Sequence, residues 1–268
     1  MKKYIFVFGG DGYIGWPLSV KLSLLKPDYQ IIIFDNMFRR KIVKKLGSNS
    51  LTNIYDIDDR IKYFQIFHKQ KNLSFVKLDL LKNNINKYFK GKKIDYVFNL
   101  AQQSSAPYSM HNMSSALFTA QNNELCNMKL LFLIKEFCPH AKYIKLGSFG
   151  EYCTTNLDIP EGFFRPSFNN KTSTHLMPYP RQSEDFYHAS KINDSNYIHV
   201  ACKNWDLSVI EIMQSTIFGI STNETSKKQL YTRFDYDQFF GTVINRFVVQ
   251  AIIKKNLTVY GTGKQRTG

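Results

Sequence analysis

A glycine-rich turn between a short apolar run and a helical pattern constrains the fold of this chain more than any other feature. The apolar run Lys3–Phe8 leads into Gly9-Gly10-Asp11-Gly12-Tyr13-Ile14-Gly15, and apolar residues then recur at helical spacing as far as Leu25. Glycines at positions 9, 12 and 15 let the backbone turn tightly and approach a pyrophosphate at the helix N-terminus. Asp35 closes the next apolar run about 20 residues on, where a carboxylate can hold ribose hydroxyls. Such a turn alone is often only structural, but this context predicts a dinucleotide-binding site.

Strand-like and helix-like segments alternate along the rest of the chain. Short apolar runs typical of buried strands recur, with helix-like stretches between them, at Gln30–Phe34, Ser74–Leu78, Tyr96–Leu100, Tyr143–Leu146 and Leu207–Met213. Parallel strands need crossover connections, which helices usually supply. The chain is therefore predicted to be an α/β protein with a doubly wound parallel sheet, that is, a Rossmann fold.

Four further segments set the expected organisation. Lys41–Lys71 is longer than a minimal crossover and is interpreted as a helix plus an insertion, and Ser183–Asn204 is predicted to be a long helix. Gln238–Lys254 is predicted to form a helix before Leu257–Tyr260, so that the alternation persists to the end. The polar stretch Asn169–Thr174 is expected to be a mobile loop. We expect residues 1–213 to form the NAD-binding domain and residues 214–268 a small substrate-binding part.

Residues after the second and third runs bear on the choice of cofactor. The Asp35 carboxylate would repel the 2′-phosphate of NADP and therefore favours NAD. Arg39 and Arg40 close behind could instead neutralise such a phosphate. Asp79 and Leu80 follow the third run, where folds of this kind contact adenine, although Asp79 also fits a helix cap.

Three side chains are candidates for acid–base chemistry. Tyr187 and Lys191 are four residues apart and share one face of the predicted long helix, where the ammonium can lower the pKa of the phenol. A tyrosine so placed can exchange a proton with a sugar hydroxyl. Such a pair also arises by chance on surfaces, and it gains meaning from the glycine-rich turn upstream. Ser148 ends the fifth run and can bond the same hydroxyl, although most serines at strand ends only satisfy turns.

Composition argues against several other classes of protein. The net charge is +15, but the lysines are scattered without an aromatic-interleaved stripe, so nucleic acid is disfavoured and anions such as nucleotide sugars are favoured. The four cysteines lack metal-ligand spacing, so we expect no zinc site, no disulfide framework, and a reducing cytoplasm. No apolar run is long enough to cross a bilayer, and no export peptide is expected.

Longer strings resemble the extended short-chain dehydrogenases that act on nucleotide sugars, and among these the UDP-sulfoquinovose synthases. They span nearly the whole chain: Gly9–Trp16, Asp35–Arg40, Ser105–Met110, Gly150–Tyr152, Asn156–Gly162, Pro178–Pro180, Phe186–Lys191, Asn223–Thr225, Arg233–Asp237 and Leu257–Gly261. The resemblance implies UDP-glucose and sulfite as substrates and a tightly held NAD that is reduced and reoxidised within one turnover. Tyr187, helped by Ser148, would take the proton of the glucose 4-hydroxyl, and Lys191 would bind the nicotinamide ribose. Loss of water from the 4-keto sugar, addition of sulfite at C6 and return of hydride would follow.

The same resemblance assigns further contacts. For the cofactor it implies Gly9, Gly12, Tyr13, Ile14, Gly15, Asp35, Asn36, Arg39, Asp79, Leu80, Asn122, Tyr187, Lys191 and Ile217. For the substrate it implies Ser104, Ser148, Tyr187, His188, Gln214, Thr242, Asn245, Thr258, Val259 and Tyr260. His188 would contact sulfite or simply pack against a neighbouring segment. A homodimer through a helical bundle is also implied.

The sequence departs from these families at informative positions. The common 4,6-dehydratases have an acidic pair just after the catalytic hydroxyl, and here Phe149 and Gly150 replace it; Glu151 is left as a base or as a structural hydrogen-bonding group. The subgroup has threonine in place of Ser148 and arginine in place of Ser104, so a cation near cofactor and substrate is lost. Family members also continue well past Gly261, so residue 268 is expected to mark an incomplete substrate-binding part.

Two other functions remain open at this point. A UDP-glucose 4-epimerase would use the same serine, tyrosine and lysine without sulfite. A non-catalytic NAD-binding homologue would bind cofactor without turnover, which Ser104 and the missing C-terminal segment make plausible. A nucleic-acid-binding module is a distant third.

Overall fold

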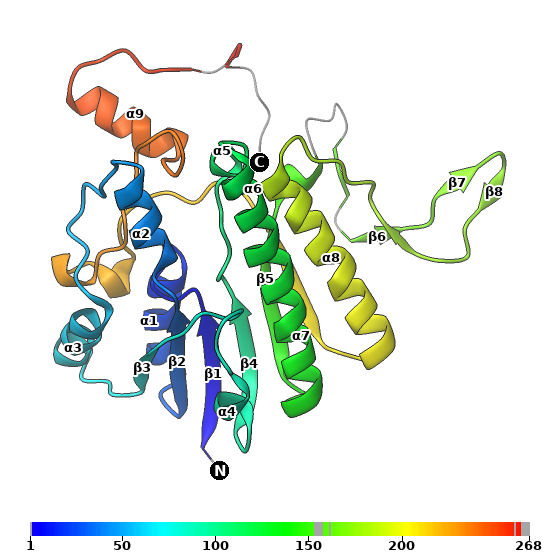
Figure 1. Cartoon of the computed structure of the whole chain (residues 1–268), viewed down its shortest axis with the longest axis horizontal. Helices are drawn as coiled ribbons and strands as arrows, with labels where there is room; N and C mark the ends of the chain where they lie inside the picture. Colours follow the sequence, from blue (N-terminus) through cyan, green and yellow to red (C-terminus); the bar gives the residue numbers. More distant parts are fainter. Residues whose placement is uncertain (1, 153–157, 161, 260, 264–268) are drawn as a thin grey trace.

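A six-stranded parallel sheet forms the centre of the molecule. The computed structural model describes residues 2–152, 158–160, 162–259 and 261–263. The strands lie in the order β10-β5-β4-β1-β2-β3, and all neighbours are parallel (Figure 1). Their bounds are β1 Lys3–Phe8, β2 Tyr29–Asp35, β3 Leu73–Lys77, β4 Lys93–Asn99, β5 Lys142–Ser148 and β10 Val209–Gln214. This topology confirms the predicted fold, since each of the six apolar runs from Lys3–Phe8 to Leu207–Met213 overlaps one of these strands.

Helices connect the strands. The helices are α1 Gly15–Leu25, α2 Phe38–Lys45, α3 Ile57–His68, α4 Asn86–Phe89, α5 Ala106–Ser109, α6 Met113–Ala120, α7 Cys126–Phe137, α8 Phe186–Trp205 and α9 Val243–Ile252. A π-helical turn, η1 Gln121–Leu125, joins α6 to α7, and short 3₁₀ turns lie at η2 Phe149–Tyr152, η3 Asn223–Thr225 and η4 Lys228–Leu230. Two small antiparallel pairs, β6 Phe163–Phe164 with β9 Met177–Pro178 and β7 Ser167–Phe168 with β8 Lys171–Thr172, form an arm that projects from the body (Figure 1).

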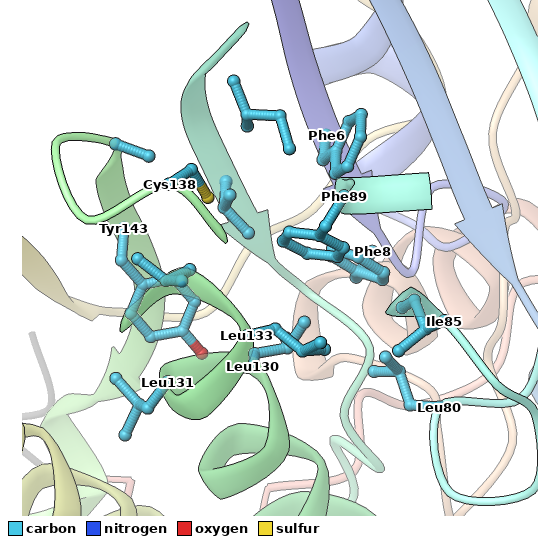
Figure 2. Close-up of a cluster of buried hydrophobic side chains, with 14 of the residues drawn as sticks. Phe6, Phe8, Leu80, Ile85, Phe89, Leu130, Leu131, Leu133, Cys138 and Tyr143 are labelled. Atoms are coloured by element: carbon cyan, nitrogen blue, oxygen red, sulfur yellow. The ribbon is translucent and has the colours of Figure 1, made fainter. Parts of the chain in front are cut away.

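Alternate residues of the central strand β1 enter two separate cores. Phe6 and Phe8 pack on one face of the sheet with residues of α4, α7 and α8, and Figure 2 shows Phe89 close to both rings. Ile5 and Val7 pack on the other face with residues of α1 and α3. A strand whose side chains are buried on both sides must be apolar at every position, which explains the continuous apolar runs. Helices therefore cover both faces, as a doubly wound sheet requires.

Three segments differ from the sequence-based expectations. The Lys41–Lys71 region contains two helices, α2 and α3, and the connection between them is held against the distant C-terminal segment through Leu51 N–H, which donates to Phe234 O at 3.0 Å. Residues 169–174 are not an irregular loop, because Asn169 and Asn170 both adopt positive φ and close the β7–β8 hairpin.

The last predicted helix is shorter than expected. Helix α9 starts only after Thr242, whose side chain accepts a hydrogen bond from Asn245 N–H and so caps the helix. The residues before it form a separate turn, because the Asp237 carboxylate accepts hydrogen bonds from the backbone N–H groups of Phe239 and Phe240. Residues 255–259 form neither helix nor strand. Within the described residues, no helix is both long and apolar enough to cross a membrane.

Candidate active site

A cleft of about 430 Å³ lies where the parallel strands end at their carboxyl edge. It brings together most of the residues singled out from the sequence. Those that line it are Gly9, Gly12, Tyr13, Ile14, Gly15, Asp35, Asn36, Arg39, Leu80, Ser104, Asn122, Ser148, Tyr187, His188, Lys191, Gln214, Ile217, Thr242 and Asn245. Asp79, Thr258 and Val259 are not among the lining residues, and Tyr260 lies outside the described residues.

The glycine-rich turn is packed so closely that side chains are excluded from it. Gly9 N–H donates to Phe34 O at 2.7 Å, and Gly12 N–H donates back to Gly9 O at 3.1 Å. A Cβ on Gly15 would lie 2.1 Å from Gly9 O. No side chain of the described residues caps the N-terminus of α1, so an anion can approach the backbone there. The turn thus has the shape and polarity that a dinucleotide pyrophosphate requires.

Asp35 is half-buried at the end of β2 and already accepts two backbone hydrogen bonds. Its carboxylate receives Asp11 N–H at 3.0 Å and Met37 N–H at 2.7 Å. Burial, followed by the nearby Asp11 charge, raises the pKa of Asp35 to about 6. The carboxylate still lines the cleft and has lone pairs left for ribose hydroxyls.

The two arginines behind Asp35 have different environments. Arg40 holds both carboxylate oxygens of Asp11, at 2.7 and 2.8 Å, and does not line the cleft. It is therefore not free to neutralise a 2′-phosphate. Arg39 does line the cleft, where it pairs with Asp235 at 2.9 Å and lies 3.7 Å from the ring centroid of Phe240.

Asp79 acts as a turn residue in this structure. Its carboxylate accepts the backbone N–H groups of Leu81 and Lys82 at 3.0 and 3.3 Å and also receives the Asn36 side-chain amide at 3.2 Å. No helix begins there, since α4 starts at Asn86, so Asp79 caps a turn and not a helix, while the neighbouring Leu80 lines the cleft.

The tyrosine, lysine and serine meet inside the cleft although they come from two distant segments. Tyr187 and Lys191 lie one turn apart on α8, with the Lys191 Nζ 5.5 Å from the centroid of the Tyr187 ring. The expected lowering of the Tyr187 pKa by the Lys191 ammonium is not found, because burial and then the Glu151 charge raise the pKa of Tyr187 well above its ordinary value. Burial, followed by the positive charge of Lys145, lowers the pKa of Lys191 to about 7. Ser148 ends β5 at the wall of the same cleft.

Glu151 and His188 complete the surroundings of the serine. Glu151 is fully buried, accepts Ser148 N–H at 2.8 Å and pairs with Arg181 at 2.8 Å. It does not line the cleft, so the structure favours the hydrogen-bonding role left open for it. His188 lines the cleft, its Nδ1 bonds the Asp185 carboxylate at 2.6 Å, and its Nε2 packs over Gly150, where a Cβ would be 2.3 Å away.

Several cleft residues escaped the sequence analysis. Gln102 follows β4 and accepts a hydrogen bond from Lys191, and Asp235 reaches Arg39 from 196 residues further along the chain. For Gln102 a signal existed, because side chains just after parallel strands usually face the ligand edge. For Asp235 only the tertiary fold brings the partners together. Among the described residues, no cluster of His, Cys, Asp and Glu could hold a metal ion.

Comparison with known proteins gives consistent results. A profile of the NAD dependent epimerase/dehydratase family matches residues 5–267. The chain is 42% identical over 274 residues to the chloroplastic UDP-sulfoquinovose synthase of Spinacia oleracea, covering all of this chain and 55% of that protein. It is 33% identical over 269 residues to the UDP-sulfoquinovose synthase of Sulfolobus acidocaldarius, covering 98% and 66%. The chain thus spans between half and two thirds of the length of these relatives.

Solved structures with low sequence identity share the fold. The UDP-glucuronic acid 4-epimerase of Bacillus cereus, in complex with UDP-glucuronic acid and NAD, has a TM-score of 0.63 at 19% identity, covering 99% of this chain and 68% of that one. The dTDP-glucose 4,6-dehydratase of Bacillus anthracis, in complex with NAD, has a TM-score of 0.61 at 20% identity, covering 97% and 65%. At this identity the likeness establishes architecture alone.

Proposed function

The chain belongs to the NAD dependent epimerase/dehydratase family, and we propose that it uses NAD to convert UDP-glucose and sulfite into UDP-sulfoquinovose. The observation that carries the proposal is that Ser148, Tyr187 and Lys191 line the same cleft as the glycine-rich turn. The identity to two synthases over essentially the whole chain supports the choice of substrates. The nicotinamide, when bound, supplies an acceptor for the C4 hydride of the sugar and later returns it.

Each side chain has a separate task in this proposal. Tyr187 takes the proton of the 4-hydroxyl, Ser148 bonds the same oxygen, and Lys191 holds the ribose and stabilises the Tyr187 phenolate. The resulting 4-keto sugar is acidic at C5, so water can leave across C5 and C6 and sulfite can add at C6. Phe149 and Gly150, in place of an acidic pair, argue against ordinary 4,6-dehydration.

The dinucleotide site fits NAD better than NADP. Asp35 places a carboxylate beside the adenine ribose, and Arg40 is fully engaged by Asp11. A 2′-phosphate would therefore meet a negative charge with no free cation from Arg40. Asp79, by contrast, has become a turn residue, so we retain Leu80 and not the Asp79 side chain as the adenine contact.

Two basic groups support binding of anionic substrates. His188, oriented by Asp185, faces the cleft beside the Ser148 loop and is proposed to contact sulfite. Arg39 Nη1 lies 3.4 Å from Ser104 Oγ, so we infer that Arg39 supplies the cation lost by the serine at position 104. Gln214, Thr242 and Asn245 line the cleft and remain the proposed sugar-nucleotide contacts, whereas Thr258 and Val259 do not line it.

Assembly and location are also part of the proposal. Residues 1–213 would bind NAD and residues 214–268 would contribute to the sugar site. Exposed apolar side chains on α6, α7 and α8, among them Leu117, Phe132 and Val200, support a homodimer through these helices. Cys126, Cys138 and Cys202 are free thiols, which supports a reducing compartment such as the cytoplasm, although the spinach relative is named as chloroplastic.

Mass spectrometry of the product tests the proposed function directly. The protein is incubated with UDP-glucose, NAD and sulfite, and a UDP-hexose sulfonate is expected. A product of unchanged mass with an isomerised sugar would replace the proposal with a 4-epimerase. Binding of NAD without any conversion would overturn it in favour of a non-catalytic homologue.

Affinity for NAD is expected to depend on pH through Asp35. The pKa of Asp35 is raised to about 6, so the carboxylate is ionised above that pH and accepts the ribose hydroxyls. Affinity should fall as the pH drops through about 6. Asp35→Asn should weaken binding about tenfold or more at pH 8, as expected for loss of a charge-assisted hydrogen bond, and should remove the pH dependence. Isothermal titration calorimetry from pH 5 to 8 measures both effects.

Asp95→Asn provides a matched control for this measurement. Asp95 accepts a hydrogen bond from Tyr29 at 2.8 Å, far from the cleft. It should leave both the affinity and its pH dependence unchanged. Equal NAD affinity in Asp35→Asn and the wild type would contradict the assigned role of Asp35.

A further inference from the structure

Two buried lysines lie on either side of one carboxylate beneath the cleft. Lys145, in the middle of β5, has its ammonium 3.4 Å from Asp194 Oδ2 and 2.9 Å from Glu211 Oε1. Asp194 lies on α8, three residues after Lys191, and both the Lys145 and Asp194 side chains are completely buried. Lys145 therefore contacts two carboxylates.

Lys191 donates to two uncharged oxygens. Its Nζ donates to Leu146 O at 2.7 Å and to Gln102 Oε1. Within the part of the chain that the structure describes, Lys191 forms no ion pair with a carboxylate. The other end of the Gln102 amide, Nε2, donates to Asp194 Oδ2, the oxygen that faces Lys145. A neutral amide thus separates Lys191 from the carboxylate next to it.

The charges around the pair explain which lysine keeps its proton. In a buried site, two neighbouring ammonium groups repel each other strongly, and the group with direct carboxylate partners is favoured in the charged form. Asp194 and Glu211 raise the pKa of Lys145 in spite of its burial. Lys191 has the opposite outcome, because burial and the Lys145 charge lower its pKa against the opposing influence of Asp194, Glu151 and Glu211.

Other charged groups that face this region do not change the assignment. Glu151, from the η2 turn, is neutralised by Arg181 at 2.8 Å, and Ser195 donates to Glu211 at 2.7 Å. Tyr187 lies on the cleft side of Lys191 and carries no charge until it loses its proton. Asp194 Oδ1 has no hydrogen-bond partner, and burial raises the pKa of this carboxyl.

We infer that Lys145, Asp194 and Gln102 are positioning residues that leave Lys191 free to change its protonation state during turnover. Lys145 fixes the charge of Asp194, and Gln102 carries the hydrogen bond between Asp194 and Lys191 without adding charge. Lys191 is then an ammonium while Tyr187 is a phenolate and an amine while Tyr187 is a phenol, so the pair holds one proton in either state. This inference rests on the proposed function for the role of Tyr187. The effect of Lys145, Asp194 and Gln102 on the protonation of Lys191 is a property of the protein alone.

The protonation of Lys191 can be measured without any sugar substrate. In protein with ¹³C-labelled lysine side chains, the Lys191 Cε signal is assigned by its absence in Lys191→Arg and followed from pH 5 to 11 by NMR. Its midpoint is expected well below the ordinary lysine value of 10.5. Lys145→Met should raise the midpoint and Asp194→Asn should lower it, each by about one pH unit or more.

Three further variants separate this effect from damage to the core. Gln102→Glu keeps both buried charges and places a carboxylate directly on Lys191, so the midpoint should rise. Lys145→Arg retains the cation and should keep the midpoint low. Lys142→Met removes an exposed lysine from the same strand and should change nothing.

The outcome shows whether Lys145, Asp194 and Gln102 set the protonation midpoint of Lys191 or only pack around it. Opposite displacements in Lys145→Met and Asp194→Asn, with a rise in Gln102→Glu, support the inference. An ordinary lysine midpoint in the wild type would overturn the inference, as would midpoint changes of the same sign in both variants. If circular dichroism shows that Lys145→Met or Asp194→Asn is unfolded, the midpoint of Gln102→Glu decides. The pH profile of NADH formation from UDP-glucose should move with the midpoint. If the protein forms no NADH, the proposed function is contradicted. The inference about Lys191 is then decided by the NMR measurement, which needs no sugar substrate.

Discussion

Tyr187→Phe is expected to slow NADH formation from UDP-glucose and bound NAD by at least about a hundredfold, which is the usual contribution of a positioned acid–base group. The variant removes one oxygen and retains the ring, which is almost completely buried. Without the phenol, its two partners cannot take over the 4-hydroxyl proton, because Ser148 is too weak a base and Lys191 is directed toward Gln102 and Leu146. Stopped-flow absorbance at 340 nm in a single turnover measures this step before sulfite is needed.

The interpretation depends on intact cofactor binding and a matched control. Tyr197→Phe removes the hydroxyl of a tyrosine on the same helix that bonds Glu124 at 3.1 Å outside the cleft. It should leave the rate unchanged within about twofold, and both variants should bind NAD as the wild type does. Undiminished NADH formation in Tyr187→Phe would remove Tyr187 from the proposed chemistry.

The fold could be predicted because its signals are local. Each central strand is buried on two faces, as the alternate packing of Phe6 and Ile5 shows, and therefore appears as a continuous apolar run. The glycine-rich turn and Asp35 lie next to strand ends, so their place at the carboxyl edge follows from topology. The resemblance found in the strings along the chain is likewise confirmed by the two related synthases.

The parts that could not be predicted depend on contacts between distant residues. Arg39 and Arg40 are adjacent and identical, yet Asp11 holds one and Asp235 directs the other toward the cleft. The helical spacing of apolar residues also predicted too early a start for α9, because the Asp237 side chain holds the residues before that helix in a turn. The β7–β8 hairpin was overlooked because its polar composition hid a turn formed by two asparagines with positive φ.

Within the candidate site, the residues proposed to react could be found from the sequence, whereas the buried charged residues around them could not. Ser148, Tyr187 and Lys191 belong to recognisable patterns, and the cleft brings them together. The state of Lys191 depends instead on Lys145, which looks like any other lysine in the sequence and is fully buried only because two carboxylates accompany it. No periodicity or motif distinguishes such a residue from the many exposed lysines of this chain.

Gly15→Ala is expected to weaken NAD binding strongly, the largest effect we predict for a single methyl group. The added Cβ would lie 2.1 Å from Gly9 O and 2.7 Å from Gly10 Cα. Both are backbone atoms, so no side chain can rotate away, and the turn must open. Opening it displaces the N-terminus of α1 from the pyrophosphate, where close approach is essential. We expect the dissociation constant to rise by about a hundredfold or more, which corresponds to about 2.7 kcal/mol.

A graded series of alanine variants tests whether the turn itself causes the loss. Gly12→Ala brings its Cβ only to 3.1 Å from Gly9 O, so a smaller loss of affinity should result. Gly47→Ala has open space around its Cβ but a φ of +70°, so it should cost about 1 kcal/mol of stability and leave NAD affinity intact. Calorimetric titration with NAD, with thermal unfolding of each variant alongside, separates binding from stability. Wild-type affinity in Gly15→Ala would mean that the dinucleotide lies elsewhere, because the turn cannot both accept this methyl group and keep the geometry that a pyrophosphate needs.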